Sequence, residues 1–321
     1  MTGYIVRRLL ATVPVVLVVS LVIFALIRVV PGDVAVLMVT GGGDTGSTTD
    51  AQAQIEKLRQ KLRLDRPLHE QYALWLWGAV RGDLGQGYWH GQPVAQEIAR
   101  AVPVSIELTV YSLAISLLLA IPTAVLSAVR QDTWQDYMGR VLSIAGLAIP
   151  EFWLGTLFVL LPVLWFNWIP PIRFVALFDD PGRHMLQFLF PSLALGLTFS
   201  ATIMRMLRSS LLEVLRQDYI RTAWSKGLAE RTVILRHALK NALIPVITLL
   251  GLRVGRLLSG AVVIEVIFGL PGMGRMTADA IRLRDYPIVE GLVLFFAIGY
   301  ALVNLVVDVA YAWLDPRIRY R

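Results

Sequence analysis

Few residues in this sequence have the types and spacing that catalysis or metal binding requires. His69 and Glu70 begin the HExxH pattern of zinc proteases, but Ala73 stands where the second histidine is needed. The sequence has no GxSxG or SxxK pattern and no cysteine, so the usual serine and thiolate nucleophiles are missing. "GGGDTGST", from Gly41 to Thr48, has the glycine spacing of a phosphate loop, but Ser47 replaces its lysine. We therefore expect neither an enzyme nor a metal centre, and no cofactor bound by this chain.

Charged residues inside long apolar runs are the remaining candidates. Arg253 and Arg256 lie three residues apart near the middle of one run, and Glu265 lies nearer its end. Each charge costs about 2.5 to 3.5 kcal/mol at mid-membrane unless it is paired or hydrated. Two interpretations are open. Either the arginines pair with Asp308 or Glu151 on neighbouring helices, or they face a hydrated path near Glu265 and attract a carboxylate.

The stretch from Asp218 to Pro245 is highly charged, although apolar runs flank it on both sides. Asp218 is a good helix cap, and Gly227 suits the left-handed residue that ends a helix. Between them, apolar residues at helical spacing predict an amphipathic helix: Tyr219, Ile220, Ala223 and Trp224. A second helix is expected from Leu228, with two cations on one face: Arg236 and Lys240. A basic helix lying on anionic lipid is the alternative interpretation.

The composition indicates the elements that must position these residues. The 321 residues are 56% hydrophobic and 17% charged, and the mean hydropathy is +0.63, which is typical of a membrane protein. A span needs about 20 apolar residues, and continuous apolar runs exclude a barrel. The sequence therefore predicts an all-α protein with six transmembrane helices. Their approximate limits are Leu9 to Val30, Val104 to Val129, Val141 to Trp168, Met185 to Leu207, Ala242 to Phe268 and Ile288 to Leu314.

The distribution of Lys and Arg predicts the orientation. Both ends of the chain, the loop with Arg130 and Arg140, and the basic stretch from Arg205 to Lys240 are expected on the cytoplasmic side. The net charge of +7 is therefore expected to reflect cytoplasmic loops and contact with membrane lipid, with no nucleic acid as partner. The first run is too long for a signal peptide and lacks a cleavage pattern.

The sequence between the first two spans forms the one sizeable external segment, residues 31–102. Two short helices are expected in it, one with Ile55, Leu58 and Leu62 on one face. Its aromatic residues would lie in the membrane interface or contact a partner. We expect three parts of the chain: residues 1–102, a five-helix core of residues 103–315 with a cytoplasmic loop at 211–241, and a tail of residues 316–321.

Several motifs carry a resemblance to a known family. "RTAWSKGLAERTVILRHALKNALIP" resembles the EAA loop of bacterial ABC-importer membrane subunits, with Ala223 and Gly227 in the expected places. Arg221 and Thr222 replace the usual acidic residue and first alanine, as in the branch that imports dipeptides, oligopeptides and nickel. "RRLLATVPVVLVVSLVIFALIRVVPGD", "LDRPLHEQYALWLWGAVRGDLG", "FGLPGMGRMTADAIRLRDYPIVEG" and "LVNLVVDVAYAWLDPRIRY" resemble the same permeases in order and spacing.

This resemblance implies a type I importer permease in the bacterial inner membrane that moves short peptides. The implied partners are a homologous second permease, two cytoplasmic ATPases that use ATP and Mg²⁺, and an external solute-binding protein. The residues implied to couple the permease to the ATPases are Asp218, Tyr219, Arg221, Thr222, Ala223, Lys226, Gly227, Glu230, His237 and Asn241. Nickel complexes, glutathione and oligosaccharides are alternative cargoes in this family. An ATP-independent secondary transporter is a different class of alternative, and the internal repeat that would favour it is not evident.

Overall fold

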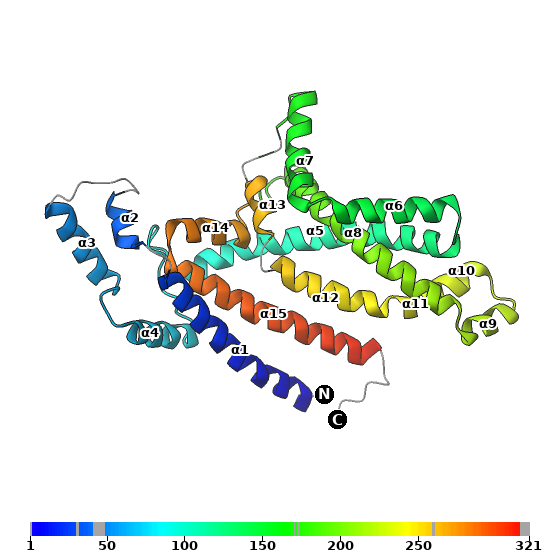
Figure 1. Cartoon of the computed structure of the whole chain (residues 1–321), viewed down its shortest axis with the longest axis horizontal. Coiled ribbons are helices and arrows are strands. Elements are labelled where there is room, and N and C mark those ends of the chain that lie inside the picture. Colours follow the sequence, from blue (N-terminus) through cyan, green and yellow to red (C-terminus); the bar gives the residue numbers. More distant parts are fainter. Residues whose placement is uncertain are drawn as a thin grey trace. The chain divides into compact units, whose positions relative to one another are not determined.

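The computed structural model describes residues 2–29, 32–40, 49–169, 171, 174–258 and 261–314. All regular elements in these residues are helices, and one isolated bridge joins Gln86 to Pro93 (Figure 1). Helices are what long apolar runs must form in lipid, because only a helix satisfies its own backbone hydrogen bonds. The expectation of an all-α membrane protein is thus confirmed.

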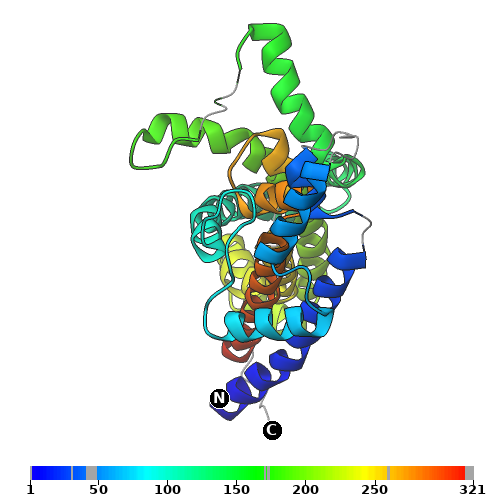
Figure 2. The same ribbon diagram turned by 90° about the vertical axis from the view of Figure 1, so that its left-hand side faces the viewer.

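The chain divides into two compact units. The first comprises Met1–Pro103 and Gly272–Ala301. Its helices include α2 to α4, which face the viewer in Figure 2. The helices are α1 (Thr2–Val29), α2 (Val34–Thr40), α3 (Thr49–Lys61), α4 (Leu68–Val80), the start of α5 (Val94–Val129), α14 (Met273–Leu283) and most of α15 (Tyr286–Leu314).

Packing in the first unit joins residues far apart in sequence. Its core unites the start of α5 with α14 and α15, and includes Val94, Ile98, Met273 and Leu292. Arg28 Nη1 also donates a 2.6 Å hydrogen bond to Glu290 Oε1, and both side chains are largely buried. A buried charge requires such a partner, so this pair fastens α1 to α15.

The second unit comprises Val104–Pro271 and Leu302–Arg321. In Figure 1, α6 and α8 run alongside each other, and α7 projects away from α6. Besides the rest of α5 and the end of α15, the elements are α6 (Trp134–Ala148), α7 (Glu151–Phe166), α8 (Pro181–Leu215), α9 (Asp218–Ser225), α10 (Glu230–Thr232), the π-helix η1 (Val233–Ala238), α11 (Leu239–Ala242), α12 (Ile244–Leu258) and α13 (Val262–Ile267).

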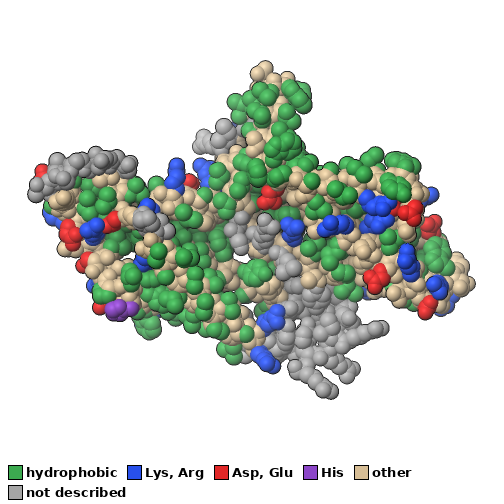
Figure 3. Space-filling model, viewed as in Figure 1, with side chains coloured by type: hydrophobic (Ala, Val, Ile, Leu, Met, Phe, Trp, Pro, Cys, Tyr) green, Lys and Arg blue, Asp and Glu red, His purple; other side chains and the backbone are tan. Residues whose placement is uncertain are grey.

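Four helices of the described residues are long and apolar enough to cross a membrane: Leu10–Val29, Val94–Val129, Pro181–Leu215 and Tyr286–Val306. Two bent pairs raise the number to six if each pair counts as one span: Trp134–Ala148 with Glu151–Phe166, and Glu230–Ala242 with Ile244–Gly255. Hydrophobic side chains cover much of the face in Figure 3, and charged ones gather near α9 and α10. An apolar exterior of this kind suits lipid.

Two of the six predicted spans each consist of a pair of helices. The run from Val141 to Trp168 is interrupted between Ala148 and Glu151, where α6 and α7 meet at 92°. Pro150 causes this break, because a proline disfavours helical backbone in the residue before it, and Ile149 is extended. The run from Ala242 to Phe268 is divided between α12 and α13, and residues 259–260 lie outside the described part.

Candidate coupling surface and charges in the apolar helices

The charged stretch folds into two helical arms, which we call the two-arm segment, residues 218–242. Its first arm is α9 and its second arm runs from α10 through η1 to α11. The first arm begins at Asp218 with Gln217 as the N-cap, so Asp218 is the first helical residue and not the expected cap. Its carboxylate still favours the helix, because negative charge near a helix N-terminus interacts well with the helix dipole.

The four apolar residues of α9 fall within one arc of about 140°, as their spacing predicts, but they are not equally buried. Ile220 and Ala223 are buried, but the side chains of Tyr219 and Trp224 are each 44% exposed. At about 100° per residue, Ile220 and Ala223 lie in the middle of this arc, and Tyr219 and Trp224 lie at its two edges. The first arm therefore anchors itself through the middle of its apolar side and exposes an aromatic residue on each flank.

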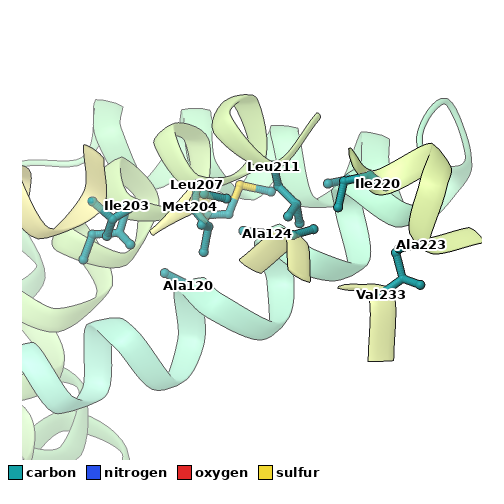
Figure 4. Close-up of a cluster of buried hydrophobic side chains, with 13 residues drawn as sticks. Ala120, Ala124, Ile203, Met204, Leu207, Leu211, Ile220, Ala223 and Val233 are labelled. Carbon is teal, nitrogen blue, oxygen red and sulfur yellow. The ribbon is translucent and has the colours of Figure 1, made fainter. Parts of the chain in front are cut away.

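The anchoring face packs into a core cluster shared with two long helices (Figure 4). Ile220 and Ala223 contact a cluster that α5 and α8 form, and Val233 of the second arm joins it. The cluster also contains Ala120, Ala124 and Ala128 of α5 and Ile203, Met204, Leu207 and Leu211 of α8. Close-packed interiors transmit displacement with little compression, so a push on either arm would move α5 and α8 as well.

Gly227 separates the two arms. It adopts φ +74°, and its N–H donates a 2.9 Å hydrogen bond to the Trp224 carbonyl oxygen. Glycine occupies this left-handed region without the cost that a β-carbon brings, which agrees with the expected helix stop. A β-carbon built at Gly227 meets no atom within 4 Å, so backbone conformation and not crowding selects glycine here.

The second arm begins later than expected and contains an irregular turn. Its helix starts at Glu230, two residues after the predicted start at Leu228, and the π-helix η1 follows directly. Asn241 Nδ2 donates hydrogen bonds to Tyr219 Oη at 2.8 Å and to the His237 carbonyl oxygen at 3.2 Å. Asn241 thus ties the end of the second arm to the first.

The structure brings the ten predicted coupling residues together on the two-arm segment. Most of them are exposed: Asp218, Tyr219, Arg221, Thr222, Lys226, Gly227, Glu230 and Asn241. His237 is half-buried, and Ala223 lies in the core. Exposed apolar side chains that the prediction did not include complete the surface: Trp224, Leu228 and Leu235. Such a mixture of aromatic, aliphatic and charged groups is suited to contact with another protein.

The charges within the apolar helices lie in different surroundings. Arg253 of α12 is half-buried, and its Nη2 lies 3.4 Å from Thr202 Oγ1 of α8. Its guanidinium carbon also lies 5.0 Å from the centre of the Phe199 ring, a cation–π contact. The side chains of Arg256 and Asp308 lie outside the described part of the structure.

Glu265 of α13 is fully buried, and Ser105 Oγ of α5 donates a 2.7 Å hydrogen bond to its Oε1. Because this carboxylate lies inside the second unit, it is not at an accessible surface in this conformation. This hydrogen bond joins α13 to α5. Glu265 therefore has a structural role in addition to its predicted role in the translocation path.

A buried ion pair that no local sequence pattern predicts joins α6 to α8. Asp136 of α6 is fully buried and accepts two 2.7 Å hydrogen bonds from Nε and Nη2 of Arg208 of α8. It also accepts hydrogen bonds from the Ser127 hydroxyl and, at 3.1 Å, from the Asp132 N–H. The two partners are separated by 72 residues, so no local spacing signals the pair.

Comparison with known proteins defines the family. Residues 1–109 match the N-terminal part of the membrane component of binding-protein-dependent transport systems, and residues 120–320 match the inner membrane component of these systems. The glutathione transport system permease protein GsiC of Escherichia coli O6:H1 is 37% identical over 321 residues, covering all of both chains. The same protein of Pectobacterium atrosepticum is 38% identical over 321 residues, with both chains again covered completely.

A solved structure supports the fold. An inward-facing form of the MetNI methionine ABC transporter has a chain with a TM-score of 0.56, at 14% identity. The match covers 68% of this chain and 97% of that one, so the two chains share a fold. The chain belongs to the family of binding-protein-dependent transport system inner membrane components, and is a multi-pass permease subunit of an ABC importer complex in the bacterial inner membrane.

Proposed function

We propose that this permease subunit imports short peptides, and that separate ATPase subunits drive it through the two-arm segment. Full-length similarity to permeases named for glutathione, which is a tripeptide, supports a peptide cargo. Di- and oligopeptides are the leading substrates, with glutathione itself, a nickel complex or an oligosaccharide as the alternatives.

The observation that carries the coupling proposal is the presence of two exposed aromatic residues beside a buried anchor on one short helix. Trp224 and Tyr219 are available to an ATPase, while Ile220 and Ala223 are packed against α5 and α8. Motion of a nucleotide-bound ATPase would therefore become rigid-body motion of these helices. The charged residues near these aromatic side chains, among them Arg221 and Lys226, would pair with the ATPase or remain hydrated.

The proposed complex contains a homologous second permease, two ATPase subunits or domains, and an external solute-binding protein. ATP and Mg²⁺ would bind to the ATPases and not to this chain, whose sequence has no phosphate-binding lysine motif. Both termini and the two-arm segment would lie in the cytoplasm. Residues 31–102 would then lie outside, where the solute-binding protein delivers its cargo.

Within the membrane, Arg253 and Arg256 would line the translocation path and attract the peptide carboxylate. Glu265 would join them only after α13 shifts relative to α5, because Ser105 now holds its carboxylate. Alternating access requires rearrangement of this kind, since one site must open to each side of the membrane in turn.

Native mass spectrometry of the complex tests this proposal. The complex is purified gently from its own host through a tag on this subunit. A mass with one copy of this chain, one homologous membrane chain and one pair of ATPase domains supports it. A monomer or homodimer without an ATPase, even after crosslinking, contradicts it and favours a secondary transporter or a lipid-bound role for the two-arm segment.

The cargo is tested separately by uptake into proteoliposomes that contain the complex and its solute-binding protein. ATP-dependent uptake of radiolabelled dipeptide, tripeptide or glutathione supports a peptide importer. Uptake of a nickel chelate or an oligosaccharide with no uptake of any peptide overturns the peptide assignment and leaves the ATPase coupling intact.

A further inference from the structure

The first unit contains a cavity of about 540 Å³. It lies among α1, α2, α3, α4, the loop after α4 and the start of α15, and every residue that lines it belongs to this unit. Sites for small organic ligands have volumes of about 300 to 1,000 Å³, so this cavity is large enough to enclose one. The two-arm segment and the residues of the proposed path belong to the other unit.

Cations dominate one wall of the cavity. Lys61 at the end of α3, and Arg63 and Arg66 in the link to α4, all line it. None of the three forms an ion pair with another described residue. All three side chains are exposed, and an anion bound between them would reduce their mutual repulsion.

Two nearby acids already pair with arginines. Asp33 pairs with Arg59, and this hydrogen bond raises the pKa of the Arg59 guanidinium. Glu290 lines the cavity but pairs with Arg28. The remaining acid in the lining is Asp83, and its Oδ1 accepts the Gly85 N–H. The lining therefore carries two more cations than acids.

The backbone conformation of Arg63 is a second indication of a ligand site. Arg63 has φ +57°, in the left-handed region where glycine is favoured and a long side chain is uncommon. The turn that ends α3 imposes this conformation, through the hydrogen bond from the Leu64 N–H to the Arg59 carbonyl oxygen at 2.9 Å. Arginine at this position is thus conformationally unfavourable, and residues held in this way cluster at ligand sites.

The rest of the lining suits the body of a small organic molecule. Apolar side chains complete the walls: Met38, Leu58, Leu62, Leu74 and Trp75. A ligand that fits would have one anionic group for the cations and an apolar portion for these walls. Carboxylates match arginine best, because the guanidinium offers parallel donors to both carboxylate oxygens.

We propose that this cavity is a binding site for a small organic carboxylate, and that the free C-terminal carboxylate of a short peptide occupies it. Arg63 and Arg66 would bind the carboxylate with support from Lys61, and Trp75 would pack against the body of the peptide. The choice of a peptide rests on the proposed function, whereas the carboxylate chemistry rests on the cavity itself.

The test is isothermal titration calorimetry with the complete transporter in lipid nanodiscs, without ATP and without the solute-binding protein. The probes are alanyl-alanine and alanyl-alanine amide, which lacks the carboxylate. We expect saturable binding of alanyl-alanine, binding of the amide at least about tenfold weaker, and a similar loss in Arg63→Gln, because each removes a charge-assisted hydrogen bond.

Two variants separate binding from folding. Arg63→Gly removes the cation and places glycine in the left-handed conformation, so it should keep or raise the thermal stability yet lose the binding. Lys57→Gln removes an exposed cation of α3 that does not line the cavity, and should leave the affinity unchanged. Equal weakening by Lys57→Gln and Arg63→Gln would mean a general charge effect and would overturn the site.

The calorimetry tests the binding site independently of the proposed function, because it measures neither transport nor ATP hydrolysis. Absence of alanyl-alanine binding in a complex that still imports peptides would overturn the site alone. If Arg63→Gln then weakened docking of the solute-binding protein, the cations would receive an acidic side chain of that protein and not a free ligand. Binding of the peptide and its amide with equal affinity would also reject carboxylate recognition.

Discussion

Arg208 of α8 holds the buried carboxylate of Asp136 of α6 through two parallel hydrogen bonds of 2.7 Å. Asp136 is fully buried and the Arg208 side chain is 16% exposed, so water screens the pair weakly. Because α8 ends three residues before α9 begins, this pair fastens α6 to the helix that leads into the two-arm segment. Movement of the first arm would therefore reach α6 as well as α5 and α8.

Removing one partner of this pair should be strongly destabilising. We expect Asp136→Ala to lower the free energy of unfolding by about 3 to 5 kcal/mol, because it leaves the Arg208 charge without its buried partner. The measurement is thermal denaturation of the purified subunit complex in detergent. The control Arg183→Gln breaks an exposed pair with Asp180 and should cost under about 1 kcal/mol. Equal melting temperatures for the two variants would contradict this prediction.

The buried and the exposed apolar residues of α9 should respond differently to truncation. Ile220→Ala should cost about 2 to 5 kcal/mol of stability, because it opens a cavity in the cluster beneath the arm. Trp224→Ala should change stability by under about 1 kcal/mol, because its side chain is 44% exposed and is not part of this cluster. We nevertheless expect Trp224→Ala to weaken retention of the ATPase in a pull-down at least about tenfold, since aromatic residues often dominate interfaces. Full ATPase retention by Trp224→Ala would contradict the coupling surface.

Gly227 should tolerate asparagine but not valine. Valine at φ +74° costs on the order of 1 kcal/mol or more and would favour another backbone conformation between the arms. We expect Gly227→Val to insert normally into the membrane but to lose ATP-dependent uptake while ATP hydrolysis continues. Gly227→Asn should retain most uptake, because asparagine adopts this conformation more readily than other residues. Uptake by Gly227→Val at the unmutated rate would disprove the coupling role of this turn.

Arg253 and Arg256 should affect transport and not assembly. We expect Arg253→Gln and Arg256→Gln to lower the uptake of peptides with a free carboxylate more than that of peptide amides, because an attracting charge is lost. Uptake of both substrates into proteoliposomes measures this preference. Arg205→Gln, which changes an exposed cation of α8, serves as the control. An unchanged rate and an unchanged preference in both variants would exclude a role in the path.

Several local features could be predicted because neighbouring residues determine them. The left-handed turn at Gly227 follows from the lack of a side chain, and the apolar runs follow from the thickness of the membrane. Pro150 was visible in the sequence, yet the run was predicted to continue through it. Prolines are tolerated in many membrane helices, so only the packing around a proline decides between a slight kink and a 92° bend.

Other features depend on contacts that no local pattern contains. The spacing of residues in α9 indicated an amphipathic helix, but how deeply each apolar residue is buried depends on where α5 and α8 lie. Likewise, the cationic cavity exists because α3 and α4 pack near the start of α15, more than 200 residues later in the chain.

The class of this protein follows from its sequence, because long apolar runs require helices in lipid and the charged motif between two such runs is typical of an importer permease. Which charges pair depends on the tertiary structure. Arg28 pairs with Glu290, which is 262 residues away in the sequence, and Arg208 pairs with Asp136, which is 72 residues away. Local propensities act over a few residues, whereas a buried charge needs a partner supplied by whichever helix packs beside it, and that choice is made only when the whole chain has folded.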